Sequence, residues 1–264
     1  MMLVTLWAAV ALAAAVPAAP SEIDRAIAMG RFDQARLMIA AKVKAGATGD
    51  AIERPLAALA FAAGRNEEAL ARLEALLRAT PDDALLLEQA TIAAFRVGKK
   101  DVAALHAERA TRHPAASWRA WNAKGVLADG ARDWAEADRA YARAAALAPD
   151  QAEIANNLGW SRLLRGDWPG AAEALARAAA LKPAAVRIAN NLDLARVGLA
   201  GDLPARRAGE SSAAYAARLN DAGVAALARG DARRARAAFS RAIEASGRWY
   251  ARADNNLALI EGRQ

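Results

Sequence analysis

The chain has 264 residues and a net charge of +7 at neutral pH. It contains no cysteine and only two histidines, which excludes disulfides and thiolate metal sites and disfavours zinc hydrolases and Ser-His-Asp enzymes. Eighty residues are alanine, the strongest helix former, whereas β-branched and aromatic residues are sparse. The composition therefore predicts an all-α fold.

The N-terminal segment carries no charged side chain. Its apolar run, residues 3–16, has the length of a signal-peptide core and is short for a bilayer span. Val16 and Ala18 supply small residues at the −3 and −1 positions of a cleavage site before Ala19. We expect residues 1–18 to be a cleaved export signal. The alternatives are an uncleaved inner-membrane anchor and an alanine-rich structural helix.

A short motif recurs along the chain, in which a glycine is followed by mostly polar residues and then by an alanine. It begins at Gly30, Gly64, Gly98 and Gly166, and Arg132 takes the place of the glycine that this spacing puts between the last two. The period is therefore 34 residues. A fixed period of this length predicts a repeat protein, in which each unit buries its apolar face against its neighbours.

The recurring residues resemble the tetratricopeptide repeat (TPR) family. In the best unit, the family pattern is met by Trp121, Gly125, Ala137, Tyr141, Ala144 and Pro149. The next unit repeats the pattern with Leu158, Gly159, Ala171, Ala178 and Pro183, and the C-terminal region with Gly223, Gly230, Ala235, Phe239 and Ala242. The resemblance implies a right-handed α-solenoid of antiparallel helix pairs.

Packing explains why some of these positions are restricted. Gly125 and Ala137 are expected where the two helices of a unit cross, because small side chains let the backbones approach and larger ones would overpack the contact. Trp121 and Tyr141 supply bulk on either side. Trp121 and Trp134 hold packing positions, and we expect both to be buried.

Helix starts are also marked in the sequence. Asp133, Asp167 and Asp231 each precede the second helix of a unit and are expected to cap it, and Glu136 is expected to complete a capping box with Asp133. Pro55 is expected in the first turn of a helix that starts near Arg54.

The repeat phase divides the chain. We expect about five units and a further helix over residues 19–197, a linker over 198–210, and a C-terminal unit with a capping helix over 211–264. The linker is predicted because two glycines and a proline interrupt the pattern within residues 197–204.

Catalytic signatures are absent from the sequence. There is no phosphate-binding glycine loop, no HExxH zinc motif and no GxSxG elbow. His106 and His113 are two turns apart on one predicted helix, too far to share a metal directly, and are expected at the surface or at a helix end. We therefore expect no enzyme activity, no cofactor, no metal site and no small-molecule substrate.

The TPR resemblance implies a concave groove, lined by positions 2, 5 and 9 of each first helix, for a protein or peptide ligand. The residues expected to contact it are Arg119, Asn122, Glu153, Asn156, Trp160, Arg187 and Asn190. Asparagine amides suit hydrogen bonds to a peptide main chain, and the indole of Trp160 suits a hydrophobic anchor. The alternative is that these asparagines brace neighbouring helices. A chaperone-tail clamp is disfavoured, because only Asn157 and Arg187 match its pattern.

Basic residues concentrate near the C-terminus. Arg229, Arg233, Arg234 and Arg236 cluster around one predicted helix start. An acidic protein or an anionic membrane surface could use this patch, giving a peripheral membrane contact, whereas the alternative is a solvated helix face. An export signal disfavours nucleic acid as the partner.

Together these features predict an exported, non-catalytic protein–protein interaction scaffold or adaptor, periplasmic or associated with a bacterial envelope. The Asn-Asn-Leu strings that begin at residues 156, 190 and 255 also resemble the TPR proteins of bacterial Flp-type (Tad) pilus assembly. The alternatives are a periplasmic scaffold of an unrelated envelope or secretion complex, and a cytosolic TPR adaptor if the N-terminus is not a signal.

Overall fold

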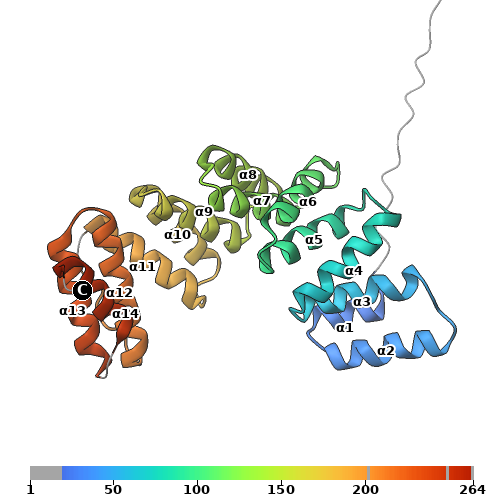
Figure 1. The fold of residues 1–264 in the computed structure, drawn as a ribbon, viewed down its shortest axis with the longest axis horizontal. Coiled ribbons are helices and arrows are strands. Elements are labelled where there is room, and N and C mark those ends of the chain that lie inside the picture. Colours follow the sequence, from blue (N-terminus) through green and yellow to red (C-terminus); the bar gives the residue numbers. More distant parts are fainter. Residues whose placement is uncertain (1–19, 201–202, 248–249, 263–264) are drawn as a thin grey trace, which may run out of the picture. The chain divides into compact units, whose positions relative to one another are not determined.

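The computed structural model describes residues 20–200, 203–247 and 250–262, which form fourteen α-helices and no strand (Figure 1). In chain order they are α1 (Glu22–Ala28), α2 (Phe32–Lys44), α3 (Asp50–Ala62), α4 (Asn66–Ala79), α5 (Ala84–Arg96), α6 (Lys100–Arg112), α7 (Trp118–Gly130), α8 (Trp134–Leu147), α9 (Ala152–Leu164), α10 (Trp168–Leu181), α11 (Val186–Ala200), α12 (Ser212–Ala228), α13 (Ala232–Ser246) and α14 (Ala251–Glu261). The predicted all-α solenoid of paired helices is confirmed. The expected export signal, residues 1–18, lies outside the described residues.

The chain divides into two compact units between Leu76 and Leu77, within α4. In the first unit, α1 and α2 pack against each other and against α3, around a core that includes Ile23, Ile39 and Leu59. α3 begins at Asp50, so the expected start near Arg54 is wrong. Pro55 lies inside the helix, which lacks the hydrogen bond that its missing N–H would have donated.

The second unit holds three consecutive pairs, α5/α6, α7/α8 and α9/α10, followed by α11 without a pairing helix and then by α12, α13 and α14. α11 continues to Ala200, so the expected linker 198–210 starts inside a helix. The reason is close packing: a Cβ atom on Gly198 would lie 2.1 Å from a ring carbon of Trp168. Gly198 therefore lets the helix lie against the indole instead of ending the helix.

The predicted helix crossing at Gly125 is confirmed and recurs in two other pairs. A Cβ atom would lie 2.7 Å from the ring of Tyr141 at Gly125, 2.5 Å from Leu175 at Gly159, and 2.4 Å from the ring of Phe239 at Gly223. These distances are too short for any side chain. In each pair, a large residue of the second helix fills the space that the glycine leaves.

The predicted aspartate caps are also confirmed. Asp133, Asp167 and Asp231 each accept a hydrogen bond of 3.0 Å from the backbone N–H three residues later. Glu136 does not complete the expected capping box. Its carboxylate pairs instead with Lys124 at 3.0 Å and Arg139 at 2.6 Å, because both cations lie within reach of the helix start.

The tryptophans differ from expectation. Trp121 and Trp134 are half-buried, whereas Tyr141 is buried to 1% exposure. The Lys124 ammonium lies 5.5 Å from the centroid of the Trp121 ring, and Trp134 lines a surface cavity. Both indoles are therefore partly exposed, and Tyr141 is the aromatic residue that fills the core of the α7/α8 pair.

Arg132 is the one non-glycine residue with positive φ among the described residues. Its φ is 59°, in a turn where the equivalent Gly98 and Gly166 have φ of 79° and 77°. The turn is the same in each case, because the N–H of the following residue donates to the carbonyl five residues earlier, at 2.9 Å from Asp133 to Ala128. Arg132 thus adopts a left-handed conformation that costs a non-glycine residue about 1–2 kcal/mol.

We expect Arg132→Gly to raise the unfolding free energy by about 0.5–1 kcal/mol, because relief of the left-handed strain exceeds the added entropy of the unfolded chain. Gly166→Arg, the reverse change at an equivalent turn, is expected to lower it by a similar amount. Denaturant unfolding of the two variants beside the wild type tests this. A less stable Arg132→Gly protein would show that the arginine side chain makes stabilising contacts.

Candidate functional site

The predicted asparagine ladder joins neighbouring helices. Asn157 donates to Oδ1 of Asn122 at 3.1 Å, and Asn191 donates to Oδ1 of Asn156 at 2.9 Å. Each bond links the first helix of one repeat to the first helix of the next. Asn122 and Asn156 are 6% and 3% exposed. Their amides are therefore buried between neighbouring helices and brace the array, as the alternative interpretation had it.

Asn190, the next asparagine in this row, accepts a hydrogen bond from an arginine and not from another asparagine. Oδ1 of Asn190 accepts from the Arg207 guanidinium at 2.8 Å, and Arg207 belongs to the irregular segment 203–210. The ladder resumes beyond this segment, where Asn256 donates to Asn220 at 3.0 Å. Arg207 thus takes the place that an asparagine of a following helix has in the preceding repeats.

The other expected groove residues are exposed: Arg119, Glu153, Trp160 and Arg187. The guanidinium of Arg119 lies 4.4 Å from the centroid of the Trp118 ring. Trp160 is 42% exposed, as expected for a side chain that points away from the core. Four of the seven predicted groove residues are therefore accessible, whereas Asn122 and Asn156 join neighbouring helices and Asn190 joins α11 to segment 203–210.

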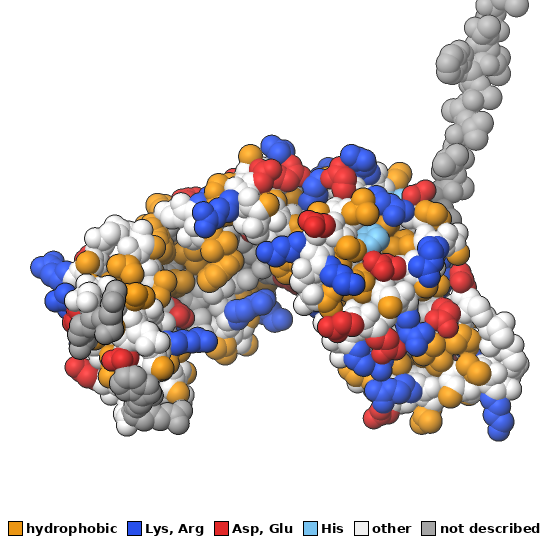
Figure 2. Space-filling view, in the orientation of Figure 1, with side chains coloured by type: hydrophobic (Ala, Val, Ile, Leu, Met, Phe, Trp, Pro, Cys, Tyr) orange, Lys and Arg blue, Asp and Glu red, His pale blue; other side chains and the backbone are white. Residues whose placement is uncertain are grey.

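Trp160 belongs to a row of apolar residues at the ninth positions, three of which the predicted groove already contained. Ninth positions of successive first helices carry Ile92, Val126, Trp160, Leu194 and Val224, and we call these five residues the apolar stripe. None is fully buried, and Val224 is 47% exposed. Figure 2 shows hydrophobic side chains gathered over α9, α10 and α11, with Lys and Arg side chains around them. The signal was available in the sequence, as apolar residues at an exact spacing of 34 from Ile92 to Leu194.

A buried polar network lies beneath this face. Tyr141 donates to one carboxylate oxygen of Asp129 at 2.7 Å, and Ser161 donates to the other at 2.5 Å. Burial raises the pKa of Asp129 despite both hydrogen bonds. The network connects α7, α8 and α9 and leaves both carboxylate oxygens engaged. The sequence alone did not predict this network.

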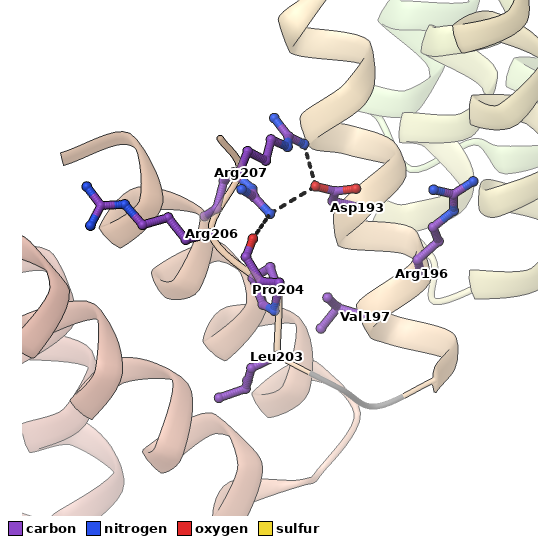
Figure 3. A pocket seen from close by; sticks show the side chains of 9 residues that line it. Asp193, Arg196, Val197, Leu203, Pro204, Arg206 and Arg207 are labelled. Atoms are coloured by element: carbon purple, nitrogen blue, oxygen red, sulfur yellow. Dashed lines mark hydrogen bonds and ion pairs between the residues drawn. The ribbon is translucent and has the colours of Figure 1, made fainter. Parts of the chain in front are cut away.

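Segment 203–210 is held to the helices on both sides. Arg218 of α12 contacts Glu210 at 2.8 Å and Asp193 of α11 at 3.0 Å, and Arg207 bonds to the same Asp193 (Figure 3). The Arg218 side chain also donates to the carbonyl of Ala205 at 3.1 Å. A cavity of about 370 Å³ remains beside this cluster. The region expected to be a linker is therefore fastened by ion pairs, of which Arg218–Glu210 is buried.

The predicted basic patch is partly neutralised. Arg229, Arg233 and Arg236 are exposed, whereas Arg234 pairs with its own helix cap Asp231 at 2.9 Å. Arg236 lies 3.8 Å from Glu261, and the Arg229 guanidinium lies 6.0 Å from the centroid of the Trp168 ring. The four arginines therefore do not form one uniform anion-binding surface.

The histidines occupy two different environments. His106 is buried, contrary to the expectation, because its position on α6 faces the neighbouring helices, whereas His113 ends α6 and accepts a hydrogen bond from the N–H of Ala115. In the part of the chain that the structure describes, no three His, Cys, Asp or Glu side chains are grouped to hold a metal. Nor does any helix within those residues have the length and apolar character to cross a membrane.

Comparison with known proteins identifies the repeat. Residues 125–186 match the model of a tetratricopeptide repeat family, and no curated protein matches the chain in sequence. Among solved structures, a tetratricopeptide repeat protein from Parabacteroides merdae is 14% identical over 91% of this chain and 96% of that chain, with a TM-score of 0.55.

Two further structures share the fold. PilW, described as a widely conserved type IV pilus biogenesis factor, is 15% identical over 89% of this chain and 94% of that chain, with a TM-score of 0.56. The APC/C hetero-tetramer Cut9-Hcn1 is 13% identical over 90% of this chain but only 41% of that chain, with a TM-score of 0.57. At these identities the likeness establishes the fold.

Proposed function

Because the chain carries tetratricopeptide repeats, a fold that serves protein–protein interaction and is generally non-catalytic, we propose that it is a scaffold that binds a protein partner along the apolar stripe. One observation carries this proposal: Trp160 is 42% exposed in the middle of a row of apolar side chains. The asparagines beside it are bonded to one another, so the stripe supplies the accessible apolar side chains of this face, next to the exposed Arg119, Glu153 and Arg187. A partner segment with apolar side chains fits it.

Trp160→Ala tests this proposal. We expect it to cost less than about 1 kcal/mol of unfolding free energy, because the side chain is exposed, and at least about 2 kcal/mol of binding free energy, because a tryptophan at the centre of an interface is a typical hot spot. The partner is first captured from the native cells with the wild-type protein and identified, and it is then titrated against both proteins.

Leu147→Ala is the matched control, since Leu147 is 46% exposed at the end of α8 and lies outside the stripe. Both variants should melt close to the wild type, and only Trp160→Ala should lose the partner. If Trp160→Ala bound the partner as tightly as Leu147→Ala, the stripe would not be the binding surface.

We further propose that the protein is exported and acts in the bacterial envelope. The support is the uncharged apolar segment 3–16 and the small residues before Ala19. The intact mass of protein purified from the native host should correspond to a chain that begins near Ala19. A cytosolic protein that retains Met1 would contradict export.

Pilus assembly is the specific envelope process we propose. Its support is the shared fold with PilW, whose description names a pilus role, together with the Asn-Asn-Leu strings of the sequence. Electron microscopy of a deletion strain should show fewer surface pili, restored by the intact gene. Normal piliation would favour an unrelated envelope or secretion complex.

A further inference from the structure

A cavity of about 570 Å³ lies in the second unit, where first helices turn into second helices. Trp134 and Trp168 line it, at equivalent positions in successive second helices, together with Leu163 and Leu164. Both indoles are half-buried, and Leu164 is 51% exposed. The walls therefore combine aromatic and aliphatic side chains with polar and charged groups, and the cavity has the size of a ligand pocket.

Among the residues that line this cavity, arginines outnumber carboxylates. Arg132 lines it, is exposed, and forms no ion pair with the residues that the structure describes. Arg229, from the predicted basic patch, lies over the Trp168 ring, and Arg165 lines the cavity while forming two hydrogen bonds to Asp138. Asp129 is the one carboxylate among the lining residues, and its oxygens are already bonded.

The backbone supplies an independent observation. Arg132 is the residue held at positive φ where the equivalent turns have glycine, and this strained position lies at the same cavity. A glycine would satisfy the turn without strain, so the turn itself does not require the arginine. Local strain of this kind is found where a side chain serves a site.

We propose that this cavity, bounded by Trp134, Trp168 and Arg132, is a second docking site that takes an acidic segment of a partner protein, with a bulky apolar side chain between the indoles and flanking carboxylates on the arginines. Charge complementarity selects this occupant. An apolar segment with basic flanks would bring its cations against Arg132 and Arg229. The site is separate from the apolar stripe and does not depend on it.

The test uses the full chain and a dye-labelled hexapeptide that has one tryptophan between glutamates, with fluorescence anisotropy as the readout. Two control peptides carry lysines in place of the glutamates, or serine in place of the tryptophan. We expect the acidic tryptophan peptide to bind at least about fivefold more tightly than either control, because one control lacks the carboxylates and the other lacks the aromatic side chain.

Arg132→Gly should weaken binding of the acidic peptide by at least about fivefold, because it removes the unpaired cation. The melting temperature of Arg132→Gly should not fall, since glycine suits the turn. A loss of binding could then not be explained by a loss of folded protein. Arg132→Lys should retain most of the binding, and Arg143→Ala, which removes an exposed arginine of α8 elsewhere, should leave it unchanged. Trp160→Ala should also bind the peptide normally.

Three results would overturn the proposal. The first is equal affinity of the wild type and Arg132→Gly for the acidic peptide. The second is loss of the preference for the acidic peptide, seen either as equal binding of the lysine and glutamate peptides or as no binding of the glutamate peptide at millimolar concentration. The third is Arg132-dependent binding to phosphatidylglycerol vesicles without binding to the peptide, which would assign the cavity to a lipid surface.

Discussion

Tyr141→Ala is expected to lower the unfolding free energy of the second unit by about 3–5 kcal/mol, the usual loss for a buried aromatic side chain. Tyr141 is 1% exposed, and its ring fills the space above Gly125 where a Cβ atom would lie at 2.7 Å. The truncation would open a cavity between α7 and α8. It would also remove one of the two donors to Asp129.

Tyr141→Phe separates the two contributions. It keeps the ring and removes the hydroxyl, so Asp129 loses a hydrogen bond in a buried site, and we expect a loss of about 1–3 kcal/mol. Denaturant unfolding and hydrogen exchange in α7, α8 and α9 measure the stability that each of the two variants loses. If the two variants lost equal stability, the hydroxyl and not the ring would dominate at this crossing.

The local features of the repeat could be read from the sequence because each depends on residues close together in the chain. An aspartate cap bonds three residues ahead, as at Asp133, and a crossing glycine faces a residue at a fixed spacing, as Gly159 faces Leu175. The period then placed the helix pairs in order. Repetition made these positions recognisable without any knowledge of the tertiary contacts.

The features that were missed depend on contacts between repeats. Asn122 bonds to Asn157, 35 residues away, and the sequence could not show whether its amide faces a neighbouring helix or a partner. The end of α11 depends on the Trp168 ring, which lies against Gly198. The position of Arg207 depends on an irregular segment that has no period to locate it.

Arg218→Ala is expected to cost about 3–5 kcal/mol of stability in the C-terminal part of the second unit, because it removes one partner of a buried ion pair and leaves the Glu210 carboxylate with the Arg207 N–H as its remaining donor. The side chains of Arg218 and Glu210 are 8% and 7% exposed. The same guanidinium also contacts Asp193 and the carbonyl of Ala205. Segment 203–210 would therefore lose its main attachment to α12.

Limited proteolysis reports this release directly, since trypsin cleaves after arginine and the segment contains Arg206 and Arg207. In the wild type, Arg206 is held by the carbonyl of Glu210, and Arg207 by Asn190 and Asp193. We expect Arg218→Ala to be cut here first and at least about tenfold faster than the wild type, because exposed irregular backbone is where cleavage concentrates. Arg241→Ala, an exposed arginine of α13, is the matched control and should be cut at the wild-type rate.

The pH dependence of cleavage tests whether the Arg218–Glu210 ion pair holds segment 203–210 in place. Burial opposes the charge of Glu210, but the backbone N–H of Arg207 and the guanidinium of Arg218 outweigh it and hold the pKa of Glu210 below its usual value. A lowered pKa means that this stabilisation is present above about pH 4.5, the usual glutamate value, and is lost as the pH falls through the lower folded-state value. Cleavage by an acid-active protease should therefore accelerate in the wild type as the pH falls below about 4.5, and this step should be smaller in Arg218→Ala, where Arg207 alone still lowers the pKa of Glu210. If Arg218→Ala were cut no faster than the wild type, the packing of Leu203 against the α12–α14 core would hold the segment, and the ion pairs would be dispensable.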